Sequence, residues 1–192
     1  MKDAKGEKMR KLVVSESVTV DGVFDAETMG QWVTPYQSDE RNECIRETFL
    51  ASDALLFGRT TYDVYAWYWP GQKNNEYGIA DRMNSIPKYV VSSTPLKAQW
   101  NNSTIIKENV VEEIARLKQK PGQDILIQGS ATLVESLAQA GLIDEYKILV
   151  HPAIMGSGKR FFKDGMGMTK LKLVESKMLS LGVVLLCYEP AR

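Results

Sequence analysis

Asp124-Ile-Leu-Ile-Gln-Gly-Ser-Ala-Thr-Leu133 is the stretch that decides the fold of this chain. A short apolar run at 125–127 predicts a buried strand, and Gly129-Ser130-Ala131 predicts a tight turn of small residues. The following residues predict a helix that ends at Gly141 and whose apolar face holds Leu133, Leu137 and Ala140. A strand that leads through a turn into a helix indicates an α/β fold.

The turn at 129–131 is also a candidate anion site. Free N–H groups at a helix start, with the helix dipole behind them, attract groups such as phosphate. Many glycine-rich turns between a strand and a helix bind nothing, so a purely structural turn is the competing interpretation. The surrounding sequence has to decide between the two.

Composition narrows the class of protein. The chain has 192 residues, which fits one domain over 10–192 behind a flexible tail at 1–9. Its 24 basic and 24 acidic residues argue against an electrostatic nucleic-acid binder. We see no apolar run long enough for a membrane span and no signal-peptide core, so we expect a cytoplasmic protein. Cys44 and Cys187 lack metal-site spacing and are expected to be reduced core residues.

Strand and helix patterns alternate along most of the chain. We expect strands at 11–20, 54–57, 88–91, 104–106, 125–127 and 146–150. Helices are expected after Ser38, from Arg59 toward Trp67, and after Asn109, where Glu112 completes a capping-box pattern. Ile45, Phe49 and Leu50 would form the buried side of the first of these helices. Val110, Ile114 and Leu117 would form the apolar stripe of the last.

The C-terminal segments 171–174 and 182–186 read as an antiparallel pair of strands. The sheet should therefore be mixed and mainly parallel, with an antiparallel C-terminal end.

Three expected strand ends carry small or hydroxyl residues. They are Gly58-Arg59-Thr60-Thr61, Ser92-Ser93-Thr94 and Gly129-Ser130-Ala131. Ligands of open α/β sheets bind at such carboxyl ends, so their coincidence favours a nucleotide site. The structural alternatives are that Thr61 caps its helix and that the serines form a turn. The chain contains neither a Gly-x-Gly-x-x-Gly fingerprint nor a Walker motif.

Asp21-Gly22 is either a simple turn or a carboxylate that orients a polar substrate beside Trp32. His151 is the only histidine, and we interpret it as a structural residue at a strand end. We find no Gly-x-Ser-x-Gly elbow and no zinc spacing, which argues against a hydrolase and a metal site.

In order, these motifs resemble the dihydrofolate-reductase-like superfamily. The run from Leu142 to Phe162, with Asp144-Glu145, Pro152 and Gly156-Ser-Gly158, is more specific. It is similar to the C-terminal domain of the riboflavin-biosynthesis deaminase–reductase (RibD), and more so to small stand-alone bacterial proteins of that branch. The resemblance covers about Arg10 to Tyr188 and implies a three-layer sandwich, a homodimer and NADPH as hydride donor. It suggests a 5-amino-6-(5-phosphoribosylamino)uracil reductase-like activity.

The resemblance also implies roles for residues. Cofactor contacts would come from Gly58, Arg59, Thr60, Thr61, Ser92, Ser93, Gln128, Gly129, Ser130, Ala131 and Thr132. Asp21 and Gly22 would border the nicotinamide and the substrate, with Asp21 our candidate for a polar substrate contact or the catalytic proton relay. Trp32 and Tyr65 are our candidates for pocket walls.

Two departures from the family pattern matter. Folate reductases have an acidic residue two places after the proline of Trp-x-x-Pro, whereas Trp32-Val-Thr-Pro35 is followed there by Gln37. A neutral amide cannot form the charge-assisted pair with a protonated pterin. The second departure is Gln128-Gly129 in place of the family's Gly-Gly, a junction that is often a cis peptide. We expect a riboflavin-type reductase, with a folate reductase of altered anchoring and a non-enzymatic nucleotide-binding protein as alternatives.

Overall fold

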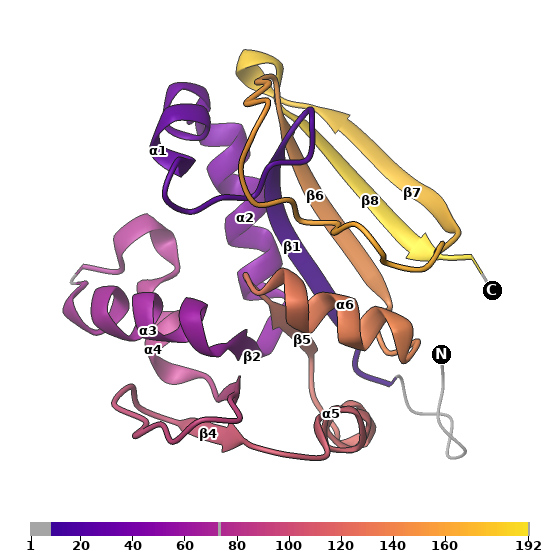
Figure 1. Ribbon diagram of the computed structural model, residues 1–192. Coiled ribbons are helices and arrows are strands. Elements are labelled where there is room, and N and C mark those ends of the chain that lie inside the picture. Colours follow the sequence, from indigo (N-terminus) through magenta and orange to yellow (C-terminus); the bar gives the residue numbers. More distant parts are fainter. Residues whose placement is uncertain (1–8, 73, 192) are drawn as a thin grey trace.

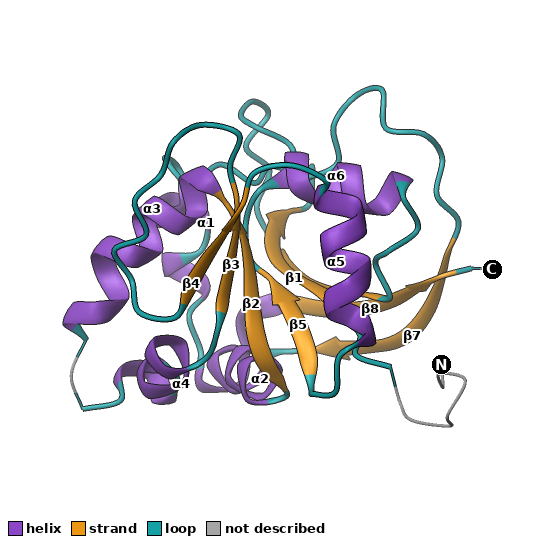
Figure 2. Cartoon of the chain, turned by 90° about the horizontal axis from the view of Figure 1, so that it is seen from below, coloured by secondary structure: helices purple, strands orange, loops and turns teal. Residues whose placement is uncertain are grey.

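The computed structural model describes residues 9–72 and 74–191 as a three-layer α/β sandwich (Figures 1 and 2). The central eight-stranded sheet has the order β4-β3-β2-β5-β1-β6-β8-β7. Its strands are β1 Leu12–Thr19, β2 Ser52–Gly58, β3 Lys88–Val91, β4 Ser103–Ile106, β5 Asp124–Ile127, β6 Glu145–His151, β7 Leu171–Met178 and β8 Val184–Pro190. The helices are α1 Met29–Trp32, α2 Asp39–Leu50, α3 Arg59–Tyr68, α4 Ala80–Ser85, α5 Val110–Gln119 and α6 Ala131–Gln139. Four short 3-10 helices lie at Thr34–Tyr36, Trp69–Gly71, Glu76–Gly78 and Ser180–Gly182.

The sheet topology confirms the mixed, mainly parallel prediction. The first six strands in sheet order, β4-β3-β2-β5-β1-β6, pair in parallel, whereas β8 is antiparallel to both β6 and β7. The predicted antiparallel end is therefore present, although Gly182 lies in a 3-10 helix and its strand begins at Val184.

Alternate residues of the central strands pack into two hydrophobic cores on opposite faces of the sheet. Leu12, Val14 and Ile127 pack beneath α5 and α6. Val13 and Leu126 face the other way, toward residues of α2, α3 and α4. A strand covered on both faces must be apolar throughout, which is why these segments read as continuous hydrophobic runs.

Three details of the predicted helices are wrong. Leu50, expected on the buried side of α2, is 42% exposed, and Ala140 is exposed beyond the end of α6. Asn109 begins α5 in a left-handed conformation with φ 52°, and its side chain makes no capping hydrogen bond. The asparagine therefore serves the left-handed turn, a conformation it tolerates better than most residues, and not the capping box.

Strand β1 extends beyond β5, and this difference in length positions the candidate site. β1 pairs with β5 only from Leu12 to Val14, but its pairing with β6 continues to Thr19. The carboxyl half of β1 is thus open on the side where β5 has ended. The backbone groups exposed there are available to side chains and ligands.

Candidate active site

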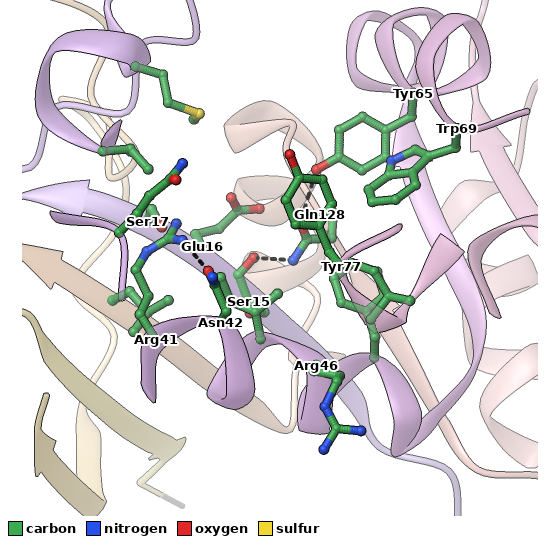
Figure 3. A pocket seen from close by; sticks show the side chains of 17 residues that line it. Ser15, Glu16, Ser17, Arg41, Asn42, Arg46, Tyr65, Trp69, Tyr77 and Gln128 are labelled. Atoms are coloured by element: carbon green, nitrogen blue, oxygen red, sulfur yellow. Dashed lines mark hydrogen bonds between the residues drawn. The ribbon is translucent and has the colours of Figure 1, made fainter. Parts of the chain in front are cut away.

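A pocket of about 380 Å³ lies against the open half of β1 (Figure 3). Its floor includes Ser15, Glu16 and Ser17, and α2 contributes Arg41. Tyr65, Trp69 and Tyr77 stand together on another side, as Figure 3 shows. We call this cavity the Glu16 pocket. It combines aromatic walls with a few polar groups, which is the usual make-up of a small-molecule site.

Gln128 links the pocket to the turn that follows β5. Its side-chain Nε2 donates a hydrogen bond of 2.8 Å to the Ser15 carbonyl, where β5 no longer pairs with β1. Its Oε1 accepts a hydrogen bond of 3.1 Å from the Tyr65 hydroxyl. Gln128, which replaces the first glycine of the family's Gly-Gly, is therefore held by hydrogen bonds to β1 and α3. The Gln128-Gly129 peptide is trans, and no peptide among the described residues is cis. Tyr65, predicted as a pocket wall, does line the pocket.

Glu16 is the group that sequence reasoning missed. Its side chain is buried, and its carboxyl accepts a hydrogen bond from the Gly129 backbone N–H. Burial raises the pKa of Glu16 to about 8, despite the opposing effect of the Gly129 hydrogen bond. At neutral pH the carboxyl of Glu16 is therefore mostly protonated. It lies in a pocket large enough for a small substrate. A charged residue in the middle of the buried strand Leu12–Thr19 was the signal that could have revealed it.

The strand ends after β2 and β5 interlock closely. A Cβ at Gly58 would lie 2.3 Å from the Ser130 Oγ, and one at Gly129 would lie 2.1 Å from the Thr61 Oγ1. Gly129 and Ser130 both have positive φ, 72° and 58°, and Ser130 caps α6. The structure thus joins two of the predicted phosphate segments. Their glycines are required by the packing of one segment against the other, because no larger residue fits.

The third predicted segment joins the same edge through Arg59. Its Nη1 donates to the Thr94 Oγ1 at 3.0 Å and to the Pro95 carbonyl at 3.2 Å, and its Nε pairs with Asp63 at 2.7 Å. Ser92 is buried and donates to the Thr94 carbonyl at 3.0 Å, whereas Ser93 is exposed. Because β3, β2 and β5 are neighbours, all three segments lie along one edge of the sheet.

Lys163 adds a cation that was not predicted. Its ammonium donates a hydrogen bond to the Thr132 hydroxyl in the first turn of α6. A positive charge beside a helix N-terminus is unfavourable by itself, because the helix dipole is positive there. An anion at this position would interact favourably with both. The donor set therefore fits a phosphate-bearing cofactor.

Asp21 and Gly22 form a turn outside the pocket lining. The Asp21 carboxylate accepts hydrogen bonds from the Thr19 hydroxyl at 2.6 Å and from the backbone N–H groups of Met155 and Gly156 at 3.2 and 2.8 Å. The Thr19 hydrogen bond is the main reason that the pKa of Asp21 is lowered to about 2, with the two N–H groups adding to it. The carboxylate that we predicted to contact the substrate or relay a proton holds the 155–156 loop against β1.

Trp32, predicted as a pocket wall, is not among the residues that line the pocket. It is only 1% exposed, and its indole packs edge-on against His151 with ring centroids 5.5 Å apart. Its neighbours Met29 and Val33 line the cavity instead. His151 is fully buried, and burial together with the Arg41 charge lowers its pKa to about 4. It is the last residue of β6, as the sequence indicated, and its structural role stays a prediction.

Two features bear on other functions. Within the described ranges, no group of three or more histidine, cysteine or acidic residues is arranged to hold a metal ion. In that same part of the chain, no helix has the length and apolarity needed to cross a membrane.

Comparison with known proteins agrees with this fold. Residues 10–185 match the model of the RibD C-terminal domain family. The uncharacterized protein YyaP of Bacillus subtilis (strain 168) is 30% identical over 190 residues, covering 94% of this chain and 95% of the relative.

Two solved structures share the architecture. A protein assigned to riboflavin biosynthesis from Shewanella sp. PV-4 superimposes with a TM-score of 0.77 at 20% identity, covering 95% of this chain and 99% of that one. Dihydrofolate reductase from Enterococcus faecalis, in complex with NADP(H), gives a TM-score of 0.63 at 15% identity, with coverages of 95% and 97%. The fold is dihydrofolate-reductase-like, and the chain belongs to the RibD C-terminal domain family.

Proposed function

We propose that this protein is an NADPH-dependent reductase that delivers hydride to a C=N or C=O bond of a small heterocyclic or sugar-linked substrate. The main support for this proposal is the Gln128-Gly129 junction. There the sheet edge with the three small-residue strand ends meets the pocket that contains the protonated Glu16. Gly129 contributes to both, because it packs on Thr61 and donates to Glu16.

The cofactor would be held along the three strand ends. Gly58, Thr60, Thr61 and the turn at 129–132 would face its pyrophosphate, with Lys163 as a neighbouring cation. Arg59, Ser92 and Ser93 would lie toward the adenosine ribose and its extra phosphate. When bound, NADPH supplies the hydride.

Glu16 is the proton donor in this proposal, in place of Asp21. Its O–H bond breaks as a new bond to hydrogen forms on the nitrogen or oxygen of the reduced group. The carboxylate left behind keeps the hydrogen bond from the Gly129 N–H. Asp21 then keeps its role in the turn and borders the site only indirectly.

Folate reduction is the second candidate, and Gln37 makes it weaker. Gln37 lines the pocket but carries no charge for a protonated pterin. Glu16 is acidic, but its pKa of about 8 leaves it mostly neutral at pH 7. A normal rate of NADPH oxidation with dihydrofolate would reverse this ranking.

Binding and turnover can be tested separately. NADPH should change the tryptophan fluorescence, because Trp69 lines the pocket. Arg59→Ala should weaken NADPH roughly three- to tenfold, whereas Arg116→Ala on the exposed face of α5 should not. Absence of binding at millimolar NADPH would leave a non-enzymatic protein and refute both reductase proposals.

Turnover should then be followed by loss of NADPH absorbance with 5-amino-6-(5-phosphoribosylamino)uracil and with related heterocycles. With an accepted substrate, Glu16→Gln should lower kcat by about a hundredfold or more while NADPH affinity is retained. An unchanged kcat would remove Glu16 from the mechanism.

We also propose a homodimer, with a second copy covering β7. All eight residues of this edge strand are exposed, among them Leu173, Val174 and Met178. An exposed apolar edge strand is a pairing surface unless it is covered. Light scattering measures the mass, and a monomer at micromolar concentration would contradict the proposal.

A further inference from the structure

Arg41 is a buried cation without a counter-charge. It is the third residue of α2 and only 8% exposed, and it lines the Glu16 pocket. Its Nη1 donates to the neutral Asn42 Oδ1 at 3.3 Å, while its Nε is buried without a hydrogen-bond partner. No ion pair to Arg41 occurs among the residues that the structure describes, and burial lowers its pKa.

An unpaired buried guanidinium is unfavourable in an isolated protein. Charges removed from water normally have a partner, and the penalty for a lone one is several kcal/mol. The helix dipole adds to the penalty, because Arg41 lies in the first turn of α2, where the dipole is positive. Nearby His151 cannot compensate, since it is neutral or positive. An anion in the pocket would offset both costs, because it would pair with the Arg41 guanidinium and interact favourably with the positive end of the helix dipole.

Other cations of the pocket and of the chain behave differently. Arg46 lines the same pocket but pairs with Glu43 on its own helix. Buried Lys118 pairs with Asp144, and buried Arg10 pairs with Asp53. Arg41 is therefore the pocket's cation that is left for a ligand.

The number of unpaired positive charges in the pocket indicates which kind of anion would bind. One guanidinium balances one negative charge, and its planar fork matches the two oxygens of a carboxylate. A phosphate monoester carries about −1.5 to −2 at pH 7 and would need a second cation. Arg46 is already paired, so the pocket does not supply that second cation.

The opposite side of the pocket indicates what carries the carboxylate. Figure 3 shows Tyr65, Trp69 and Tyr77 across the cavity from Arg41, with Glu16 between them. Aromatic side chains favour contact with a flat ring. We propose that the Glu16 pocket binds an aromatic or heterocyclic carboxylate, with the carboxylate on Arg41 and the ring against Tyr65 and Trp69. As a statement about the substrate, this rests on the proposed reductase function.

Matched small probes test the site without knowledge of the substrate. Calorimetry on the full chain at pH 7 should show benzoate binding roughly ten- to hundredfold tighter than benzamide, its neutral counterpart. Arg41→Met should abolish this preference, Arg41→Lys should keep part of it, and Arg46→Met should leave it intact. Arg41→Met should also melt at the same temperature as the wild type or above it, because the lone buried charge is removed.

The outcomes separate cleanly. Equal binding of benzoate and benzamide by the wild type overturns the inference, and this comparison needs no variant to fold. So does benzoate binding that survives in Arg41→Met, or phenyl phosphate binding more tightly than benzoate. Arg41-dependent benzoate binding without NADPH binding would refute the reductase proposal and keep the carboxylate site. NADPH binding without a preference for benzoate over benzamide would refute the carboxylate site and keep the reductase proposal.

Discussion

Buried charge is handled in opposite ways at the two ends of the sheet. At the amino ends of the strands, Lys118 pairs with Asp144 before β6, and Arg10 pairs with Asp53 at the start of β2. At the carboxyl half, Glu16 is buried without a cation and Arg41 without an anion. Burial alone therefore does not tell whether a charged side chain has a counter-charge inside the protein.

The difference follows from what each end has to do. The buried cations at the amino ends have ion pairs within the protein, and Lys118 also donates a hydrogen bond of 2.6 Å to the Leu142 carbonyl. The carboxyl ends of parallel strands meet ligands, so part of their bonding capacity has to stay unused in the free protein. The contrast yields expectations that can be ranked by size.

The largest effect at a single pH is expected at the paired end. Lys118→Met keeps the length of the side chain but removes the ion pair that Lys118 makes with the mostly buried Asp144. It should lower the free energy of unfolding by roughly 3 kcal/mol in urea denaturation at pH 7. A loss below about 1 kcal/mol would mean that the two ends do not differ, since Arg41→Met is expected to lose nothing.

A second effect, which depends on pH, is expected at Glu16. Its pKa is raised from 4.5 unfolded to about 8 folded, so between these values the folded state holds a proton that the unfolded state releases. Stability contributed by Glu16 is therefore present below about pH 4.5 and is lost as pH rises toward 8.

Glu16→Gln has no proton to lose and should escape this decline. Relative to wild type, the variant should gain a few kcal/mol between pH 5 and pH 9, from about 1.4 kcal/mol per unit of pKa shift. Urea unfolding at both pH values measures the gain. Parallel curves for the two proteins would show that Glu16 ionises normally and is not a proton donor at pH 7.

The smallest effect is expected where a pair is exposed. Arg116 bonds Glu113 one turn earlier on α5, but its side chain is 71% exposed. Arg116→Met should change stability by less than about 0.5 kcal/mol in the same assay. A loss as large as that of Lys118→Met would mean that the size of the stability loss depends on ion pairing and not on burial.

Much of the fold could be read from the sequence. The apolar runs of β1, β2 and β5 and the turn at 129–131 lie where the patterns placed them, and the antiparallel C-terminal pair is present with shifted ends. These features depend on residues close in sequence, where periodicity and turn chemistry are informative. The convergence of Gly58, Arg59 and Ser130 was also predictable, because carboxyl ends of parallel strands share one edge.

The pocket could be read only in part. Glu16 accepts a hydrogen bond from Gly129, 113 residues away, and Arg41 reaches the same cavity from a helix. Asp21 looked like the better acid because Asp-Gly at a strand end is a visible motif, whereas its oxygens bond to Thr19 and the 155–156 loop. Such partners are set by tertiary packing, which local patterns do not encode.

The sequence by itself determined the layers, the mainly parallel sheet and the small-residue edge at 58–61 and 129–131, because these follow from hydrophobic period and glycine sterics. Only the tertiary structure decided which charges are satisfied. β1 extends past β5, and that difference in strand length opens the cavity in which Glu16 keeps its proton and Arg41 lacks a partner. A pKa or an unpaired charge depends on everything within a few ångströms, and those neighbours come from all parts of the chain.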